Sequence, residues 1–300
     1  MKNVIGVVGA SGRLGIEILC LAQEMHFQIV STSSRHGSSH THLNLLKKLN
    51  HQELDAIFGH CNSIVYLPGI RENLNLLDMG RSILDRVNYK ALGELAYWAL
   101  LRRKHLIFTS GAIVYRDVSQ HLLKEECEVG ISGISIPYAW TKIKAEKLLT
   151  DLISKGLNCT IIRPSSIFGG HPLNKGMIEK LVTDSIDSSE IEIYPPLSQR
   201  VGFVHVKEVA SCILFAIENR IFQTLNISSL ETPSVLQIAQ VLAWCSKKRI
   251  KILPNKYTGI QSKDRFLLSS QKLLDLGWTP MRSLEAYIEY EYRQELEKSL

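Results

Sequence analysis

The fold is decided by Val4-Ile5-Gly6-Val7-Val8-Gly9-Ala10-Ser11-Gly12-Arg13-Leu14-Gly15, near the start of the chain. Its first five residues form a continuous apolar run, as expected of a strand that is buried on both faces. The glycines that follow let backbone N–H groups approach a pyrophosphate without obstruction by Cβ atoms, and the N-terminus of the next helix stabilises the negative charge. The stretch therefore predicts a strand, a turn and a helix that together bind a dinucleotide.

Three glycines of this turn have separate predicted tasks. Gly9 makes the tight turn, Gly12 permits the close approach of the pyrophosphate, and Gly15 permits close packing of the helix on the strand. A structural alternative is a glycine-rich turn that only packs a helix against a strand. The position of the motif, after the first strand and before an amphipathic helix, favours the cofactor site.

Apolar runs and helical patterns alternate along the first half of the chain. Such repetition indicates the α/β class, with a Rossmann-type, doubly wound parallel sheet. Further strands are expected at 28–32, 63–67, 106–109 and 159–163, and helices at 14–25, 88–101 and 139–154.

The character of the sequence changes after Arg163-Pro164, where glycine and proline turns interrupt irregularly interleaved strands and helices. We expect two domains, an NAD(P)-binding Rossmann domain over 1–165 and a smaller C-terminal α/β lobe over 166–300 that binds the substrate. Two later segments, 202–206 and 224–227, are expected to return to the main sheet.

Composition narrows the class of protein. The 300 residues carry a net charge of +6, and 45% are hydrophobic, which is enough for a large core. The basic residues are dispersed, and we expect their densest run, Lys247-Lys248-Arg249, to be a solvated helix end rather than a nucleic-acid site. The six cysteines are scattered without metal-ligand spacing, which indicates reduced thiols and no metal site. Without a signal peptide or a membrane-length apolar run, we expect a soluble, cytoplasmic protein that binds no membrane.

A second motif, Tyr138-Ala139-Trp140-Thr141-Lys142, places a phenol and an ammonium four residues apart. On a helix the two side chains share one face, where the ammonium lowers the phenol pKa from about 10 toward the working range. We expect Tyr138 to exchange a proton with a substrate hydroxyl while hydride moves, and Lys142 to hold the nicotinamide ribose. The spacing alone is weak evidence, because ten tyrosines offer many chances for a lysine at this distance.

The end of the second expected strand indicates the choice of cofactor. NAD sites place an acid there for the ribose 2′-hydroxyl, whereas this chain has Ser31-Thr32-Ser33-Ser34-Arg35. Hydroxyls such as that of Ser34 beside the Arg35 guanidinium suit a 2′-phosphate, and Arg13 supplies a second positive group. We therefore expect NADP(H) as the preferred cofactor, with NAD(H) as the alternative if Arg35 is only a surface cation.

Taken in order, these motifs resemble those of the extended short-chain dehydrogenases/reductases, the NAD-dependent epimerase/dehydratase group that modifies sugar nucleotides. The similarity covers nearly the whole chain. The matching segments are the glycine turn, Asn88, Phe108-Thr109-Ser110-Gly111-Ala112-Ile113-Val114-Tyr115, Tyr138 with Lys142, Arg163-Pro164-Ser165-Ser166-Ile167-Phe168-Gly169, Arg200-Val201-Gly202-Phe203-Val204-His205-Val206 and Leu276-Gly277-Trp278-Thr279-Pro280.

The resemblance implies the roles of individual residues, and it also exposes departures. The family's catalytic Ser or Thr falls at Gly111, which has no hydroxyl, so Ser110 is the candidate to replace it; a shift of one residue on an extended segment reverses the side-chain face. Pro68-Gly69 stands where the family usually has two alanines. Further cofactor contacts are implied for Ser11, Leu14, Ser34, Leu67, Asn88 and Arg163.

The same resemblance assigns Arg200 and Arg265 to the diphosphate of a nucleotide-sugar substrate, although two surface ion pairs explain them nearly as well. It implies a homodimer. The function expected is an NADP(H)-dependent oxidoreductase, epimerase or dehydratase that transfers hydride at a hydroxyl or ketone carbon. The alternatives are an NADPH-dependent reductase of a small carbonyl compound and a non-catalytic NADP-binding regulatory protein, the latter motivated by Gly111.

Overall fold

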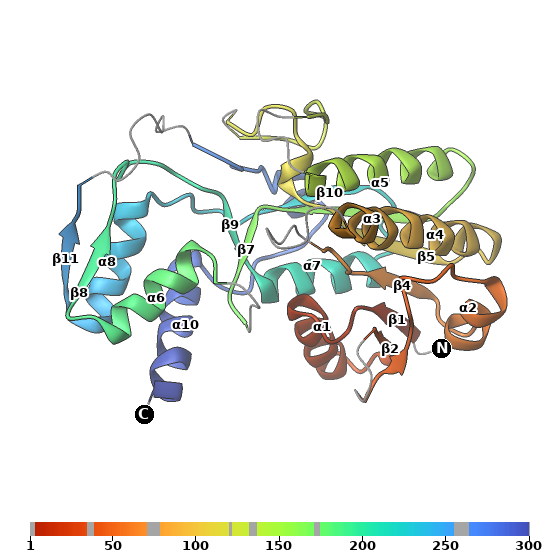
Figure 1. Ribbon diagram of the computed structural model, residues 1–300, viewed down its shortest axis with the longest axis horizontal. Coiled ribbons are helices and arrows are strands. Elements are labelled where there is room, and N and C mark those ends of the chain that lie inside the picture. Colours follow the sequence, from red (N-terminus) through yellow and green to blue (C-terminus); the bar gives the residue numbers. More distant parts are fainter. Residues whose placement is uncertain are drawn as a thin grey trace. The chain divides into compact units, whose positions relative to one another are not determined.

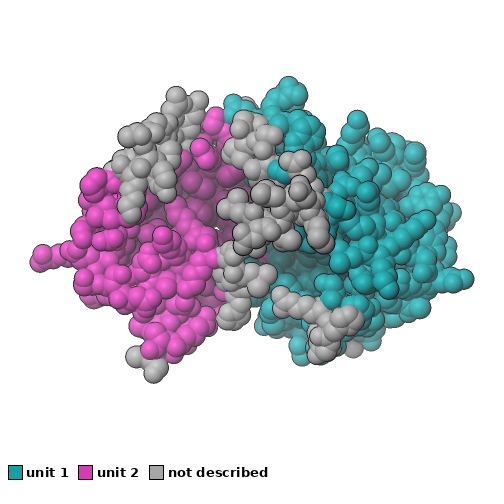
Figure 2. All heavy atoms as spheres, viewed as in Figure 1, with its two compact units in different colours: residues 1–117, 125–164, 209–225 teal, residues 118–124, 165–208, 226–300 magenta. Residues whose placement is uncertain are grey.

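A computed structural model describes residues 4–34, 39–70, 79–119, 122–131, 137–170, 175–254 and 264–299. The chain forms two compact units (Figure 2). Unit 1 comprises residues 1–117, 125–164 and 209–225, and unit 2 comprises residues 118–124, 165–208 and 226–300. Both units therefore draw on segments that are far apart in the sequence.

A parallel sheet forms the centre of unit 1. Over the described residues it has seven strands in the order β10-β6-β5-β4-β1-β2-β3. Neighbouring strands pair in parallel from β6 across to β3, so the expected α/β class with a Rossmann-type parallel sheet is confirmed. The strands are β1 (Val4–Val8), β2 (Gln28–Ser33), β3 (Thr41–His42), β4 (Ser63–Tyr66), β5 (His105–Thr109), β6 (Cys159–Pro164) and β10 (Thr224–Ile227).

Helices cover both faces of this sheet, which explains why strands such as β4, β5 and β6 are buried along their whole length. In Figure 1, α3, α4 and α5 lie on one side of the sheet, and α1 and α7 lie on the other. The helices are α1 (Arg13–Glu24), α2 (His51–Phe58), α3 (Met79–Asp85), a π-helical turn (Arg86–Lys90), α4 (Ala91–Leu101), α5 (Pro137–Ile153) and α7 (Val206–Glu218), with a 3₁₀ turn at Ala112–Val114.

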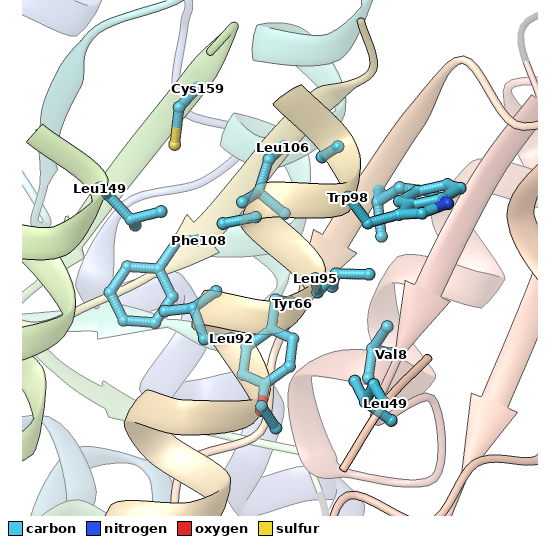
Figure 3. Close-up of a cluster of buried hydrophobic side chains, with 14 of the residues drawn as sticks. Val8, Leu49, Tyr66, Leu92, Leu95, Trp98, Leu106, Phe108, Leu149 and Cys159 are labelled. Atoms are coloured by element: carbon cyan, nitrogen blue, oxygen red, sulfur yellow. The ribbon is translucent and has the colours of Figure 1, made fainter. Parts of the chain in front are cut away.

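The core of unit 1 lies between the sheet and α4 with α5. Figure 3 shows Leu106 and Phe108 of β5 pointing toward Leu92 and Leu95 of α4. Trp98 is fully buried among them, and its indole N–H donates to the Asp55 carboxylate at 2.9 Å. Ala145, Leu149 and Leu152 of α5 belong to the same buried cluster, so this core also holds α5, the helix that carries the tyrosine–lysine motif, against the strands.

Unit 2 combines helices with two small sheets. Its elements are β7 (Ser166–Phe168), α6 (Met177–Asp187), β8 (Glu190–Ile193), β9 (Phe203–His205), α8 (Val235–Ser246), β11 (Arg249–Ile252), α9 (Gln271–Asp275) and α10 (Leu284–Ser299). β8 pairs with β11 and β7 with β9, each in parallel. Buried residues of α6, α8 and α10 share one apolar core.

Of the two segments expected to return to the main sheet, one does so. Residues 224–227 form β10 at its edge, as predicted. The expectation for 202–206 is wrong, because this segment forms β9 in a separate sheet. Its backbone groups are used elsewhere: the Gly202 carbonyl accepts from Ser166 N, and Gly202 N donates to Arg265 O, both at 3.0 Å. None of the helices in the described part of the chain is long and apolar enough to cross a membrane.

Candidate active site

The turn after β1 is anchored on the end of β2. Gly9 has φ +85°, a left-handed conformation that glycine adopts without steric cost. The N–H groups of Gly9 and Ala10 donate to the Thr32 carbonyl at 3.1 and 3.0 Å, and Gly12 N donates to Gly9 O at 3.0 Å. The turn is therefore tight, and it delivers the chain directly into α1.

Close packing of α1 on this turn depends on Gly15. A Cβ atom there would lie 2.5 Å from Gly9 O and 2.6 Å from Ala10 O, which are backbone atoms that cannot give way cheaply. At the start of the helix, Gly12 provides no side-chain cap, and the first turn contains no acidic residue. The positive end of the helix dipole is thus left uncompensated by its own side chains, which suits an anionic group.

Around this turn, the hydroxyls of Ser11 and Ser33 form a hydrogen bond of 2.8 Å, which ties the turn to the last residue of β2. Ser34 follows and is exposed, while Arg35 lies outside the described residues. Arg13, in the first turn of α1, is half-buried. The predicted cofactor residues Leu14 and Leu67 are half-buried as well, and Leu67 N donates to Val8 O at 3.2 Å.

Tyr138 and Lys142 both lie in α5, one helical turn apart. The Lys142 side chain is buried, and its Nζ atom donates to the Thr109 carbonyl at 2.7 Å. A Cβ atom placed on Gly69 would lie 3.6 Å from both the Tyr138 hydroxyl and Lys142 Nζ. The phenol and the ammonium therefore both lie close to the loop that follows β4.

Asn88, in the π-helical turn, holds this loop against α5. Its buried amide accepts from Ile70 N at 2.8 Å and donates to Ile70 O at 2.9 Å and to Thr141 Oγ1 at 3.0 Å. Thr141 in turn donates to the Tyr138 carbonyl at 2.7 Å. Sequence reasoning did not single out Thr141, although its place three residues after Tyr138 is the spacing of a helical hydroxyl that bonds back to the preceding turn.

Residues 109–111 bring two unsatisfied hydroxyls to the end of β5. Thr109 Oγ1 and Ser110 Oγ are both buried and have no hydrogen-bond partner among the described residues. Gly111 follows in an extended conformation, with φ 169° and ψ 161°. A buried hydroxyl without a partner costs about 1–3 kcal/mol, so a ligand that supplies a partner would gain that free energy.

Arg163 is held by hydrogen bonds to other residues of unit 1. Its guanidinium donates to the Glu146 carboxylate in α5 at 2.6–3.2 Å, and also to the Tyr115 hydroxyl at 3.1 Å and the Glu125 carbonyl at 3.0 Å. Burial opposes the charge, but the hydrogen bonds to Glu146 outweigh it and raise the pKa of Arg163 above its usual value. This side chain braces β6 against α5, and its role toward a cofactor stays a prediction.

The two arginines predicted to bind substrate belong to unit 2. Arg200 forms an ion pair with Asp264, at 2.9 Å through Nε and 2.5 Å through Nη2. Arg265 is exposed, and its backbone N–H donates to Arg200 O at 3.0 Å. The structure therefore brings the two residues together, with one guanidinium already partnered by a carboxylate.

The geometry fits a dinucleotide cofactor. Larger side chains would fill the glycine turn, and the N-terminus of α1 carries no acidic residue. The Tyr138 hydroxyl and Lys142 Nζ lie close to the loop that follows β4, at the same carboxyl edge of the sheet. Within the described ranges, no cluster of His, Cys, Asp and Glu side chains could hold a metal ion. The chemistry of the site is thus that of an anion-binding turn beside a phenol and an ammonium.

Among protein families, the model of the NAD dependent epimerase/dehydratase family matches residues 5–228 of this chain. A curated relative, dTDP-4-dehydro-6-deoxy-D-allose reductase of a Streptomyces species, is 27% identical over 134 residues, which cover 43% of this chain and 41% of the relative. The aligned part thus spans about two fifths of that protein.

Solved structures agree on the fold. A protein described as a putative epimerase from Burkholderia cenocepacia is similar over 99% of this chain and 98% of its own, with a TM-score of 0.82 and 18% identity. UDP-glucose 4-epimerase from Thermotoga maritima, solved with UDP-glucose, gives a TM-score of 0.80 with 17% identity over 99% of this chain and 100% of its own.

Proposed function

Since this chain belongs to the NAD dependent epimerase/dehydratase family, we propose that it is an NADP(H)-dependent oxidoreductase or epimerase acting on a nucleotide sugar. Hydride transfer would occur at a hydroxyl or ketone carbon, with Tyr138 as the acid/base. The observation that carries the proposal is that the Tyr138 hydroxyl and Lys142 Nζ both lie close to Gly69. Gly69 follows β4, which pairs with β1, the strand that precedes the glycine turn.

A bound nicotinamide cofactor would supply or accept the hydride. Tyr138 donates its proton to the oxygen of a ketone that is being reduced, and takes a proton from the hydroxyl in the reverse direction. Lys142, whose Nζ atom donates to the Thr109 carbonyl, would place a positive charge near the phenol and would hydrogen-bond the ribose of a bound cofactor. Ser110 offers its unsatisfied hydroxyl to the substrate oxygen, in place of the hydroxyl that Gly111 lacks.

The preference for NADP(H) rests on the end of β2. Residues 31–34 are Ser, Thr, Ser and Ser, so no acidic side chain stands there to repel a 2′-phosphate. Ser33 forms a hydrogen bond with Ser11 of the glycine turn, and Ser34 is exposed. Titration of the purified protein with NADPH and NADH tests this preference. A tenfold or greater preference for NADH would contradict it.

A nucleotide-sugar substrate is supported by two observations. The Streptomyces relative acts on a dTDP-linked keto sugar, as its name states. Arg200 and Arg265, neighbours in unit 2, offer the guanidinium groups that bind phosphate oxygens well. Binding of dTDP or UDP, measured by calorimetry, separates this proposal from a small-carbonyl reductase, which should bind neither.

We extend the proposal to a homodimer in a reducing compartment such as the cytoplasm. Helix α4 leaves Tyr97 and Leu101 about half exposed, at 52% and 49%, which is apolar surface that a second copy would cover. The six cysteines all lie in the described residues and none forms a disulfide, as expected in such a compartment. Analytical ultracentrifugation of the wild type and of a Tyr97→Glu variant tests the dimer, because the charge should shift the population to monomer.

Replacement of Tyr138 by phenylalanine is the direct test of the reaction. With a dTDP-linked 4-keto-6-deoxy sugar and NADPH, Tyr138→Phe should lower kcat by about 10²–10⁴-fold and leave the Kd for NADPH unchanged. Tyr97→Phe, a change of the same kind on an exposed helix face, serves as the control and should keep full activity. Unchanged turnover in Tyr138→Phe would favour the non-catalytic, cofactor-binding alternative.

A further inference from the structure

Unit 2 contains a cavity of about 300 Å³, and the described residues that line it all belong to this unit. Its volume is at the lower end of the range for pockets that bind small molecules. Trp278 and Tyr287 line the cavity and are buried, whereas Leu230 and Met281 line it and are 55% and 49% exposed. The cavity therefore has aromatic rings in its wall and apolar side chains that reach the solvent.

Glu208, in the first turn of α7, is the buried carboxylate of this cavity. The residue is 4% exposed. Its Oε1 atom accepts three hydrogen bonds, from Met281 N at 2.8 Å, Arg282 N at 3.0 Å and the Tyr287 hydroxyl at 2.8 Å. Its Oε2 atom is buried and accepts no hydrogen bond from any described residue. The fold thus uses one oxygen of this carboxylate and leaves the other unsatisfied.

Glu208 also lacks a counter-charge. Its hydrogen-bond donors among the described residues are two backbone amides and a phenol, which are all neutral. Glu231 is a second carboxylate in the lining, and it too accepts from neutral donors, the Ser229 hydroxyl at 2.6 Å and Leu284 N at 3.3 Å. Burial, and to a lesser extent the charge of Glu231, raises the pKa of Glu208. Because buried charges in proteins are normally paired, two carboxylates at one cavity indicate a positively charged ligand.

The basic residues in the lining are directed to other partners. The Arg282 guanidinium lies over the rings of Tyr287 and Tyr290, at 6.0 and 5.5 Å from their centroids. The Nε2 atom of His205 lies 2.9 Å from Glu291 Oε1. An ammonium on a ligand would therefore supply a positive charge that these two side chains do not bring to the Glu208 carboxylate.

We propose that this cavity binds a small organic cation, whose ammonium group pairs with the Glu208 carboxylate and whose apolar part packs against Trp278. The ammonium donates to Oε2, the acceptor that the fold leaves unused. Aromatic walls suit such a ligand better than a bare metal ion, and the described residues offer no group of three His, Cys, Asp or Glu side chains for a metal. None of the described residues in the lining belongs to the candidate active site, so the cavity is a second site and does not depend on the proposed reaction.

Benzylamine and benzyl alcohol are the probes, because both carry the same aromatic ring and only the amine is charged at neutral pH. In calorimetric titrations of the full chain, the Kd of benzylamine should be lower than that of benzyl alcohol by about tenfold or more, as expected from a hydrogen bond between charged groups. Equal affinities, or binding of neither probe, would overturn the proposal.

Glu208→Gln tests the assigned partner of the ammonium. Glutamine keeps an oxygen for the three donors and removes the charge, so the Kd for benzylamine should rise by about tenfold or more. Glu179→Gln is the matched control, because Glu179 is another buried glutamate of unit 2, accepts from Gly169 N at 3.3 Å and is not among the residues that line the cavity. This control should bind benzylamine as the wild type does. A similar loss in both variants, or no loss in Glu208→Gln, would contradict the role of Glu208.

A variant at the exposed part of the lining decides the question if Glu208→Gln does not fold. Leu230 is 55% exposed, so Leu230→Lys disturbs little packing and brings an ammonium of the chain itself to the cavity. It should compete with benzylamine and raise its Kd by about tenfold or more. Leu276→Lys, at an exposed leucine outside the lining, is the control and should leave the Kd unchanged. A wild-type Kd in Leu230→Lys would overturn the proposal.

Discussion

Lys142 in α5 donates a hydrogen bond from its buried ammonium to the carbonyl oxygen of Thr109, the last residue of β5, at 2.7 Å. The same ammonium lies 4.5 Å from the centroid of the Phe108 ring. A buried ammonium needs such partners, because burial without them costs several kcal/mol. The end of β5 therefore fixes the position of the positive charge beside the phenol of Tyr138.

Replacement of Lys142 by methionine keeps the aliphatic stem and removes the charge. We expect kcat to fall by about 10²-fold or more, because the phenol loses the neighbouring positive charge on which its proton transfer depends. Lys144→Met, an exposed lysine of the same helix, is the matched control and should leave kcat unchanged. Steady-state kinetics of both variants decide the question, and an active Lys142→Met protein would remove this residue from the mechanism.

Gly15→Ala tests the packing of α1 on the glycine turn. Because the new Cβ would lie 2.5 Å from Gly9 O, the helix must move, and we expect a loss of about 1–3 kcal/mol in the free energy of unfolding together with weaker NADPH binding. Gly93→Ala in α4 is the control: its Cβ would meet only the flexible end of Leu148, so urea unfolding should show little change. A Gly15→Ala protein with wild-type stability and wild-type affinity for NADPH would contradict the role of Gly15 in packing α1 on the turn.

The buried pair of Arg163 and Glu146 should be required for stability. Glu146→Ala leaves the guanidinium buried without its carboxylate, and we expect the free energy of unfolding to fall by about 3–5 kcal/mol. Glu128→Ala removes the exposed partner of Arg116 and should cost less than about 1 kcal/mol. If denaturation gave similar losses for both variants, the ion pair between α5 and β6 would not have the bracing role assigned to it.

His105 predicts a pH dependence of stability. Burial, and secondarily the charge of Arg220, lowers its pKa to about 4 in the folded protein, against the usual value of about 6.5. The unfolded chain therefore binds the proton more readily, so stability is fully present above pH 6.5 and declines as pH falls toward 4, by up to about 3 kcal/mol. Urea unfolding of the wild type and of His105→Gln between pH 7.5 and 4.5 measures this decline. The variant should lose less stability over that range than the wild type. Equal declines would show that the lowered pKa of His105 is not the cause.

Much of the fold follows from local sequence patterns. The apolar run at 4–8 and the glycines after it predict β1 and α1 because burial on two faces and close backbone approach leave few other residue choices. Predicted strands at 28–32, 63–67, 106–109 and 159–163 agree with the observed strands to within a residue at each end. The segment 202–206 was expected in the main sheet but joins another one, because a short apolar run does not specify which sheet it enters.

For the predicted site residues too, local sequence determines some features and tertiary packing determines others. The spacing of Tyr138 and Lys142 places both on one side of a helix through local geometry alone. The partners of Arg163 could not be predicted, because Glu146 is 17 residues away and meets it only when β6 packs beside α5. The motif that contains Arg163 does not reveal that a carboxylate accepts hydrogen bonds from its guanidinium, because this contact forms only when the chain packs.

By itself, the sequence determined the parallel α/β fold, the glycine turn and the pairing of phenol and ammonium, because each depends on spacings within one strand, turn or helix. Only the tertiary structure decided what holds those groups in place: Asn88 to Ile70 and Thr141, and Lys142 to Thr109, across 18, 53 and 33 residues of chain. Such contacts depend on the order of the strands and the docking of α5, which arise when the whole apolar core is buried together and which no local pattern encodes.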